Sequence, residues 1–140
     1  MTLKVARVDT WSASLQDKAG NLAAKLSALA NAGINLEFVI ARRSPDTPGT
    51  GVLFVTPIKG AAATRAARLA GFKRSTSMHT VRVECPDKVG QGRAIAQALA
   101  DQGLNLRGFS AAAVSKKCVV HIAVDKAGDV TKAMRLLRAL

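Results

Sequence analysis

The chain has 140 residues, of which 49% are hydrophobic and only 4% aromatic, and its formal net charge is +12. That length suits one ordinary domain or two small ones. No run approaches the ~20 apolar residues of a membrane span, and residues 1–9 alternate apolar and charged side chains without the apolar core of a secretory signal. We therefore expect a cytoplasmic protein with no membrane partner, and a core of Ala, Leu, Val and Ile.

The positive charge is spread over both halves of the chain. Residues 1–70 carry nine Lys or Arg against four Asp or Glu, and residues 71–140 carry twelve against five. Such a balance attracts polyanions non-specifically and would also suit an acidic ligand or an acidic partner surface. A solubilising surface is the equally simple alternative. Because aromatic residues for base stacking are nearly absent, we expect no specific nucleic-acid binding.

Hydrophobic periodicity and turn residues predict strands and helices in a repeated order. In the first half the expected elements are strands at 3–9 and 11–15, a helix after residue 20, strands at 34–40 and 52–56, a helix at 61–70 and a strand at 72–77. In the second half they are a strand at 79–85, a helix after residue 90, strands at 104–109 and 118–124, and a helix at 129–140. Gly33 and Gly103 stand where a helix ends in a left-handed residue.

The two halves are copies of one unit. Residues 17–36 align with residues 87–106 at an offset of 70, and ten of the twenty positions are identical. The identical positions include the turn motifs Asp-Lys-x-Gly and Gly-x-Asn-Leu. Chance rarely reproduces two such motifs at the same distance from each other. A missed repeat would misassign the whole fold.

The order strand, helix, strand, strand, helix, strand is that of a ferredoxin-like βαββαβ unit. We therefore predict an α+β protein with two such units at 1–77 and 78–140, each an antiparallel sheet with helices on one face. The second copy lacks its own fourth strand, whereas residues 3–9 precede the first copy. We infer that residues 3–9 supply this strand to the second unit, since an open sheet edge would favour aggregation.

At this point the residues resemble a known family. Asp-x-x-Gly at a strand-to-helix turn, then a helix, then Gly-Ile-Asn-Leu entering a strand, is similar to the ACT domain, and the resemblance covers nearly all of the chain twice. It implies a free-standing tandem ACT protein in which sheets join side by side. It also implies that small effectors, often amino acids, bind at the interface between units near the first turn. The family pattern has Pro before the Gly, where this chain has Ala19 or Val89.

The predicted ligand site follows the repeated turns. Asp17 and Asp87 are expected to cap the helices that follow, while Gly20 and Gly90 let a carboxylate approach the amides of the helix N-terminus. An ammonium group could then meet either Asp. The resemblance assigns a ligand-contacting amide to Asn35 and Asn105, although an Asn that satisfies its own turn is an equal alternative. The full predicted set is Asp17, Lys18, Ala19, Gly20, Asn35, Asp87, Lys88, Val89, Gly90 and Asn105.

Other chemistry-bearing residues favour no further site. His79 and His121 have no ligand-type neighbours at metal spacing, and Cys85 and Cys118 are expected to be reduced and packed on neighbouring strands. Arg42 and Arg43 form a basic corner that either clamps an acidic ligand or is merely solvated. Phosphate-loop and hydrolase motifs are absent, so we expect no enzyme activity, no cofactor and no metal.

The sequence therefore predicts a non-catalytic regulatory or sensor protein that binds an amino acid or a related metabolite between ACT units. The alternative is a protein-interaction subunit that regulates a separate metabolic enzyme without a ligand of its own, which Ala19 and Val89 favour mildly. In either case we expect a homodimer, because units of about 70 residues are marginal alone.

Overall fold

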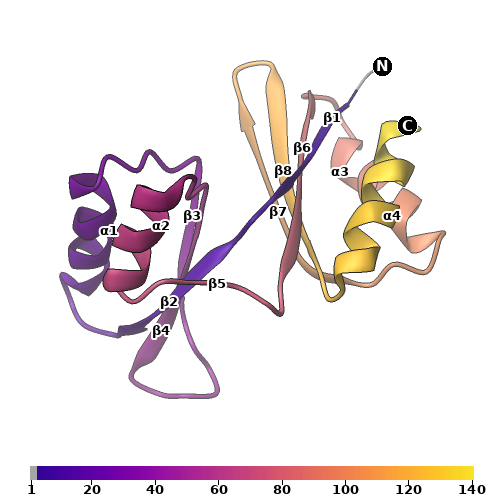
Figure 1. The fold of residues 1–140 in the computed structure, drawn as a ribbon. Helices are drawn as coiled ribbons and strands as arrows, with labels where there is room; N and C mark the ends of the chain where they lie inside the picture. Colours follow the sequence, from indigo (N-terminus) through magenta and orange to yellow (C-terminus); the bar gives the residue numbers. More distant parts are fainter. Residues whose placement is uncertain (1–2) are drawn as a thin grey trace. The chain divides into compact units, whose positions relative to one another are not determined.

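A computed structural model describes residues 3–140 and divides the chain into two compact units. The first unit is Asp9–Ser75, and the second combines the residues up to Val8 with Thr76–Leu140. Each unit has a four-stranded antiparallel sheet with two helices on one face (Figure 1). The predicted α+β fold, two ferredoxin-like units, is confirmed.

The first unit contains six elements in βαββαβ order. They are β2 (Trp11–Gln16), α1 (Asn21–Asn31), β3 (Phe38–Arg43), β4 (Thr50–Thr56), α2 (Ala61–Leu69) and β5 (Lys73–Arg74). The sheet order is β3-β4-β2-β5. Alternate residues of the strands face the helices, so Trp11, Leu53 and Val55 are fully buried in the core together with Leu29 of α1.

The second unit repeats this order with its fourth strand taken from the chain's start. Its elements are β1 (Lys4–Val8), β6 (His79–Pro86), α3 (Gln91–Ala100), β7 (Leu106–Val114), β8 (Lys117–Val124) and α4 (Ala127–Arg138). The sheet order is β1-β6-β8-β7. Its core is larger, with Ile95 and Leu99 of α3 and Val130 and Leu137 of α4 packed on buried strand residues.

The N-terminal strand is an integral part of the second unit. In β1, Lys4 lies opposite Glu84 and Val8 opposite Thr80. Leu3, just before the strand, is only 7% exposed and belongs to the second unit's core. A guanidinium N–H of Arg138 in α4 donates to the carbonyl of Val5 at 3.2 Å. The strand predicted at 3–9 therefore has the role that the repeat suggested.

Two strands of the first unit differ from the prediction. The strand expected at 34–40 runs instead from Phe38 to Arg43, because Ile34 and Leu36 pack against the core and the N–H of Ile34 still bonds the carbonyl of Leu29. The strand expected at 72–77 is reduced to Lys73–Arg74, since it follows the left-handed turn at Gly71 (φ 90°) and bends follow it at residues 76 and 77. Because β5 begins only at Lys73, the part of β2 beyond Ser12 has no partner in β5.

Candidate functional site

The turn between the first strand and first helix has the same backbone in both units. Gly20 (φ 89°) and Gly90 (φ 81°) are left-handed and are the N-cap residues of α1 and α3. No described atom lies within 4 Å of where a Cβ would stand on either glycine. The left-handed backbone, which a glycine adopts without strain, and not close packing, therefore explains the glycine at both turns.

The prediction that Asp17 and Asp87 cap the helices is wrong. In the described chain neither helix N-cap receives a side-chain hydrogen bond. The residues between Asp17 and the helix form a tight turn, in which the N–H of Asn21 bonds the carbonyl of Lys18 at 3.3 Å. The Asp is thus three residues before the N-cap, too early for its carboxylate to serve the first helical amides.

Asp17 instead pairs with the basic corner. Its carboxylate accepts a hydrogen bond from Nε of Arg43 at 2.8 Å, and both side chains are substantially exposed. Exposed pairs of this kind contribute little stability. Arg43 is therefore not solely solvated: it lies on β3 beside the first turn and orients its carboxylate.

One hydrogen bond from a side-chain amide to the backbone is repeated in the two units and was not predicted from the sequence. The side-chain amide of Asn21 donates to the carbonyl of Gln16 at 3.1 Å, and that of Gln91 donates to the carbonyl of Pro86 at 3.0 Å. Each bond ties the first helical residue to the last strand residue and so fixes the width of the turn. The sequence signal for this bond is a side-chain amide, Asn or Gln, at the same position of both repeats.

The predicted residues separate into two groups within each unit. Residues 17–20 and 87–90 form exposed turns at the N-terminal ends of α1 and α3. Asn35 and Asn105 are exposed beyond the C-terminal ends of the same helices. With 1.5 Å of rise per residue, the 11 residues of α1 span about 16 Å. A unit therefore does not bring its own Asn and Asp together.

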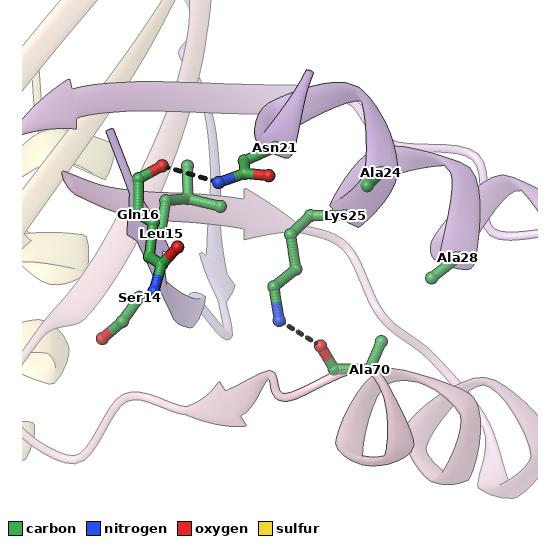
Figure 2. Close-up of a pocket in the computed structure, with 8 residues that line it drawn as sticks. All are labelled: Ser14, Leu15, Gln16, Asn21, Ala24, Lys25, Ala28 and Ala70. Carbon is green, nitrogen blue, oxygen red and sulfur yellow. Dashed lines mark hydrogen bonds between the residues drawn. The ribbon is translucent and has the colours of Figure 1, made fainter. Parts of the chain in front are cut away.

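A cleft of about 430 Å³ lies beside the first turn, within the first unit. It is lined by Ser14, Leu15, Gln16, Asn21, Ala24, Lys25, Ala28 and Ala70 (Figure 2). Nζ of Lys25 donates to the carbonyl of Ala70 at 2.6 Å and stands 5.9 Å from the ring centroid of Phe72. This cleft was not predicted from the sequence. The signal for it was Lys25, because the equivalent position of the other repeat is the apolar Ile95.

The two cysteines lie opposite each other on β6 and β8 as free thiols. Sγ of Cys85 donates weakly to the carbonyl of Cys118 at 3.6 Å. Burial raises the pKa of the Cys85 thiol to about 11, and the neighbouring Cys118 thiol adds to this shift. A raised thiol pKa suppresses the reactive thiolate, so this pair suits packing better than chemistry.

We predict that native Cys85 resists alkylation. In a Cys118→Ala variant, iodoacetamide at pH 8 should modify Cys85 at least about tenfold more slowly in the native protein than in urea, because little thiolate forms. The protonated thiol also stabilises the fold below its unfolded pKa, and this contribution is lost as the pH rises from about 9 towards 11. Equal rates in both states would contradict the burial of Cys85.

The described part of the chain, residues 3–140, holds no group of three or more His, Cys, Asp or Glu side chains arranged to hold a metal ion. None of its helices is long and apolar enough to cross a membrane.

No family model and no curated protein sequence matches this chain. Solved structures similar to it include protein BT0572 from Bacteroides thetaiotaomicron, with a TM-score of 0.78 and 17% identity over 94% of this chain and 88% of that one. The regulatory subunit of aspartate kinase from Thermus thermophilus, in its ligand-free form, has a TM-score of 0.65 and 18% identity over 99% and 96%. Aspartokinase III from E. coli, in complex with lysine and aspartate, has a TM-score of 0.58 and 15% identity over 98% of this chain but 32% of its own. The chain therefore shares the fold of these structures, two ferredoxin-like units.

Proposed function

We propose that the protein is a non-catalytic regulator that binds an amino acid or a related small metabolite at its strand-to-helix turns. The observation that carries this proposal is the repeated turn itself. Both copies keep a left-handed glycine as the N-cap, and neither N-cap makes a side-chain hydrogen bond in the described chain. The N–H groups of Asn21 and Gln91 bond the carbonyls of Lys18 and Lys88, so the amides after them are the donors proposed for a carboxylate. An exposed helix N-terminus of this kind favours a carboxylate.

The chemistry of the turns matches a zwitterion. A carboxylate would accept hydrogen bonds from the amides of the first helical turn that come after Asn21 or Gln91, and an ammonium group would meet the Asp that opens the turn. Asp17 is already paired with Arg43, whereas Asp87 makes no ion pair in the described chain. Asp87 is thus the better partner for an ammonium group. The remaining proposed contacts at the turns are Lys18, Ala19, Lys88 and Val89, whereas Asn35 and Asn105 lie beyond the C-terminal ends of α1 and α3 and are not part of this turn site.

The structural neighbours include the regulatory subunit of aspartate kinase from Thermus thermophilus and an aspartokinase solved in complex with lysine and aspartate, and the proposal agrees with both. Because the identities are only 15–18%, the likeness supports the shared fold alone. The identity of this chain's effector must therefore be inferred from the chemistry of its own turns.

A second candidate function is a protein-interaction subunit of a separate enzyme. Val89 is fully exposed at the second turn, and apolar side chains on the edge strands are also exposed, including Val39 and Ile40 of β3 and Val114 of β7. Unpaired sheet edges with apolar side chains are sites of association. The same edges would serve the homodimer that we propose for the free protein.

Thermal unfolding with a panel of the twenty amino acids tests the leading proposal. One amino acid should raise the midpoint saturably, because a ligand at 100 times its Kd stabilises the native state by about 2.7 kcal/mol. An Asp87→Asn variant should lose most of this shift, whereas Asp46→Asn, the same loss of charge at an exposed loop position of the first unit, should keep it. If no amino acid shifts the midpoint and an enzyme subunit co-purifies with the protein, the second function replaces the first.

A further inference from the structure

The edge of β2 is open in the first unit. β5 pairs with β2 at only two positions, Trp11 with Arg74 and Ser12 with Lys73. In the second unit, the corresponding strand β1 pairs with β6 at five positions, from Lys4 to Val8. No residue of β5 therefore lies opposite Ser14.

The backbone of Ser14 points towards this open edge. In an antiparallel strand, successive residues direct their N–H and C=O groups to opposite neighbours. The N–H of Asp17 bonds Gly49 on the β4 side, and the carbonyl of Thr10 accepts from Ser75 on the β5 side. By this alternation, the N–H and C=O of Ser14 face the β5 side at a point where β5 has not yet begun, because the register places Ser14 opposite Gly71.

The second unit shows what normally fills this space. Lys25 of α1 corresponds to Ile95 of α3, which is fully buried. Arg74 opposite Trp11 corresponds to Arg7 opposite Val81. Four positions earlier on each strand stand Ala70 and Leu3, and Leu3 is a core residue. The first unit thus replaces two large apolar side chains by a lysine and an alanine.

The resulting cleft contains a cation without a carboxylate. Its described lining holds Lys25 but no Asp or Glu, and its walls are the apolar side chains of Leu15, Ala24, Ala28 and Ala70. The Lys25 ammonium uses one donor on the Ala70 carbonyl at 2.6 Å. An ammonium has three donors, so two remain for a ligand. Figure 2 shows the side chain crossing the cleft from α1 to Ala70.

We propose that this cleft binds a small aliphatic monocarboxylate. The carboxylate accepts hydrogen bonds from the Lys25 ammonium and from the N–H of Ser14 at the open edge, and the aliphatic chain lies against the alanine walls. The volume of about 430 Å³ is near the lower end for ligand pockets, which fits a chain of a few carbon atoms. Each protein chain has this site in its first unit alone, because Ile95 and Leu3 occupy the equivalent space.

This site is separate from the turn sites of the proposed function. Asp17, Lys18, Ala19 and Gly20 do not line the cleft. A ligand for the cleft requires no ammonium group, whereas the turns are proposed to bind a zwitterion. The two proposals can therefore fail independently.

Titration of the ¹⁵N-labelled full chain with sodium butyrate, followed by NMR, tests the cleft. We expect saturable shifts of the amides of Ser14, Leu15, Lys25 and Gly71. Lys25→Ile, which copies the other repeat, should weaken butyrate binding about tenfold or more, since a hydrogen bond to a charged group is lost. Ala70→Leu should block binding by filling the cleft. Lys59→Met, which removes an exposed lysine elsewhere in the unit, should leave the affinity unchanged.

Three outcomes would overturn the inference. These are equal butyrate affinity of the Lys25→Ile variant, equal binding of butylammonium, or butyrate shifts confined to the turns at residues 17–20 and 87–90. Thermal unfolding of Lys25→Ile checks that the first unit remains folded. An amino-acid response that persists in this variant would leave the proposed function intact while the cleft is rejected.

Discussion

Deletion of residues 1–8 should unfold the second unit and leave the first unit folded. The deletion removes β1 from its pairing with β6 and takes the buried Leu3 out of the core. It also breaks the bond between Arg138 and the Val5 carbonyl. Hydrogen exchange measured by mass spectrometry should show protection lost over residues 76–140 and retained over residues 9–75.

A strand moved to the other end of the chain provides the control. Residues 3–8, joined behind Leu140 through a short flexible linker, should restore protection of the second unit, because the strand then follows α4 as in an ordinary βαββαβ unit. Leu3→Ala in the intact chain should cost about 2–5 kcal/mol of unfolding free energy. Full protection of residues 76–140 in the deleted chain would show that β1 is dispensable.

Exchanging the residues at the equivalent positions of α1 and α3 should change the stability of the two units to very different extents. Ile95→Lys places an ammonium where the side chain is fully buried, and it should destabilise the second unit by more than about 4 kcal/mol. Lys25→Ile removes a partly buried hydrogen bond to Ala70 and should change the stability of the first unit by about 1 kcal/mol or less. Urea unfolding followed by circular dichroism measures both.

Ile95→Met separates the effect of charge from that of shape. This volume-conserving change should cost less than about 1.5 kcal/mol. If Ile95→Lys proves as mild as Ile95→Met, then α3 also has an open side at this position. The asymmetry between the two units, on which the cleft depends, would then be absent.

The fold was predictable because its signals are repeated. The offset of 70 places the same glycines, helix faces and strand starts in both halves. An element predicted in one copy is therefore supported by the equivalent residues of the other. The position of β1 followed from the same comparison, since only residues 3–9 were available for the missing strand. The short β5 was not predictable, because the residues from Phe72 onwards do not reveal that the turn at Gly71 and the bends at residues 76 and 77 confine the strand to Lys73–Arg74.

The site was less predictable because it depends on single bonds. Asp17 had the residue type and approximate place of a helix cap, and only the turn after it, with Arg43 across from β3, excludes that role. Lys25 looked like an ordinary surface lysine on an amphipathic helix. Its cleft exists because β5 begins only at Lys73 and Ala70 is small, which are properties of distant residues in the folded unit.

The partnership of β1 with β6 also sets an order of events during synthesis. Lys4 is synthesised before Glu84, with which it pairs, and about 80 residues separate the two. The first unit, Asp9–Ser75, contains all of its own strands and can fold as soon as it emerges. The second unit must wait for α4, and until then β1 is an unpaired strand that a neighbouring nascent chain can capture. Bulky N-terminal fusions should therefore impair the yield of folded protein more than equivalent C-terminal ones.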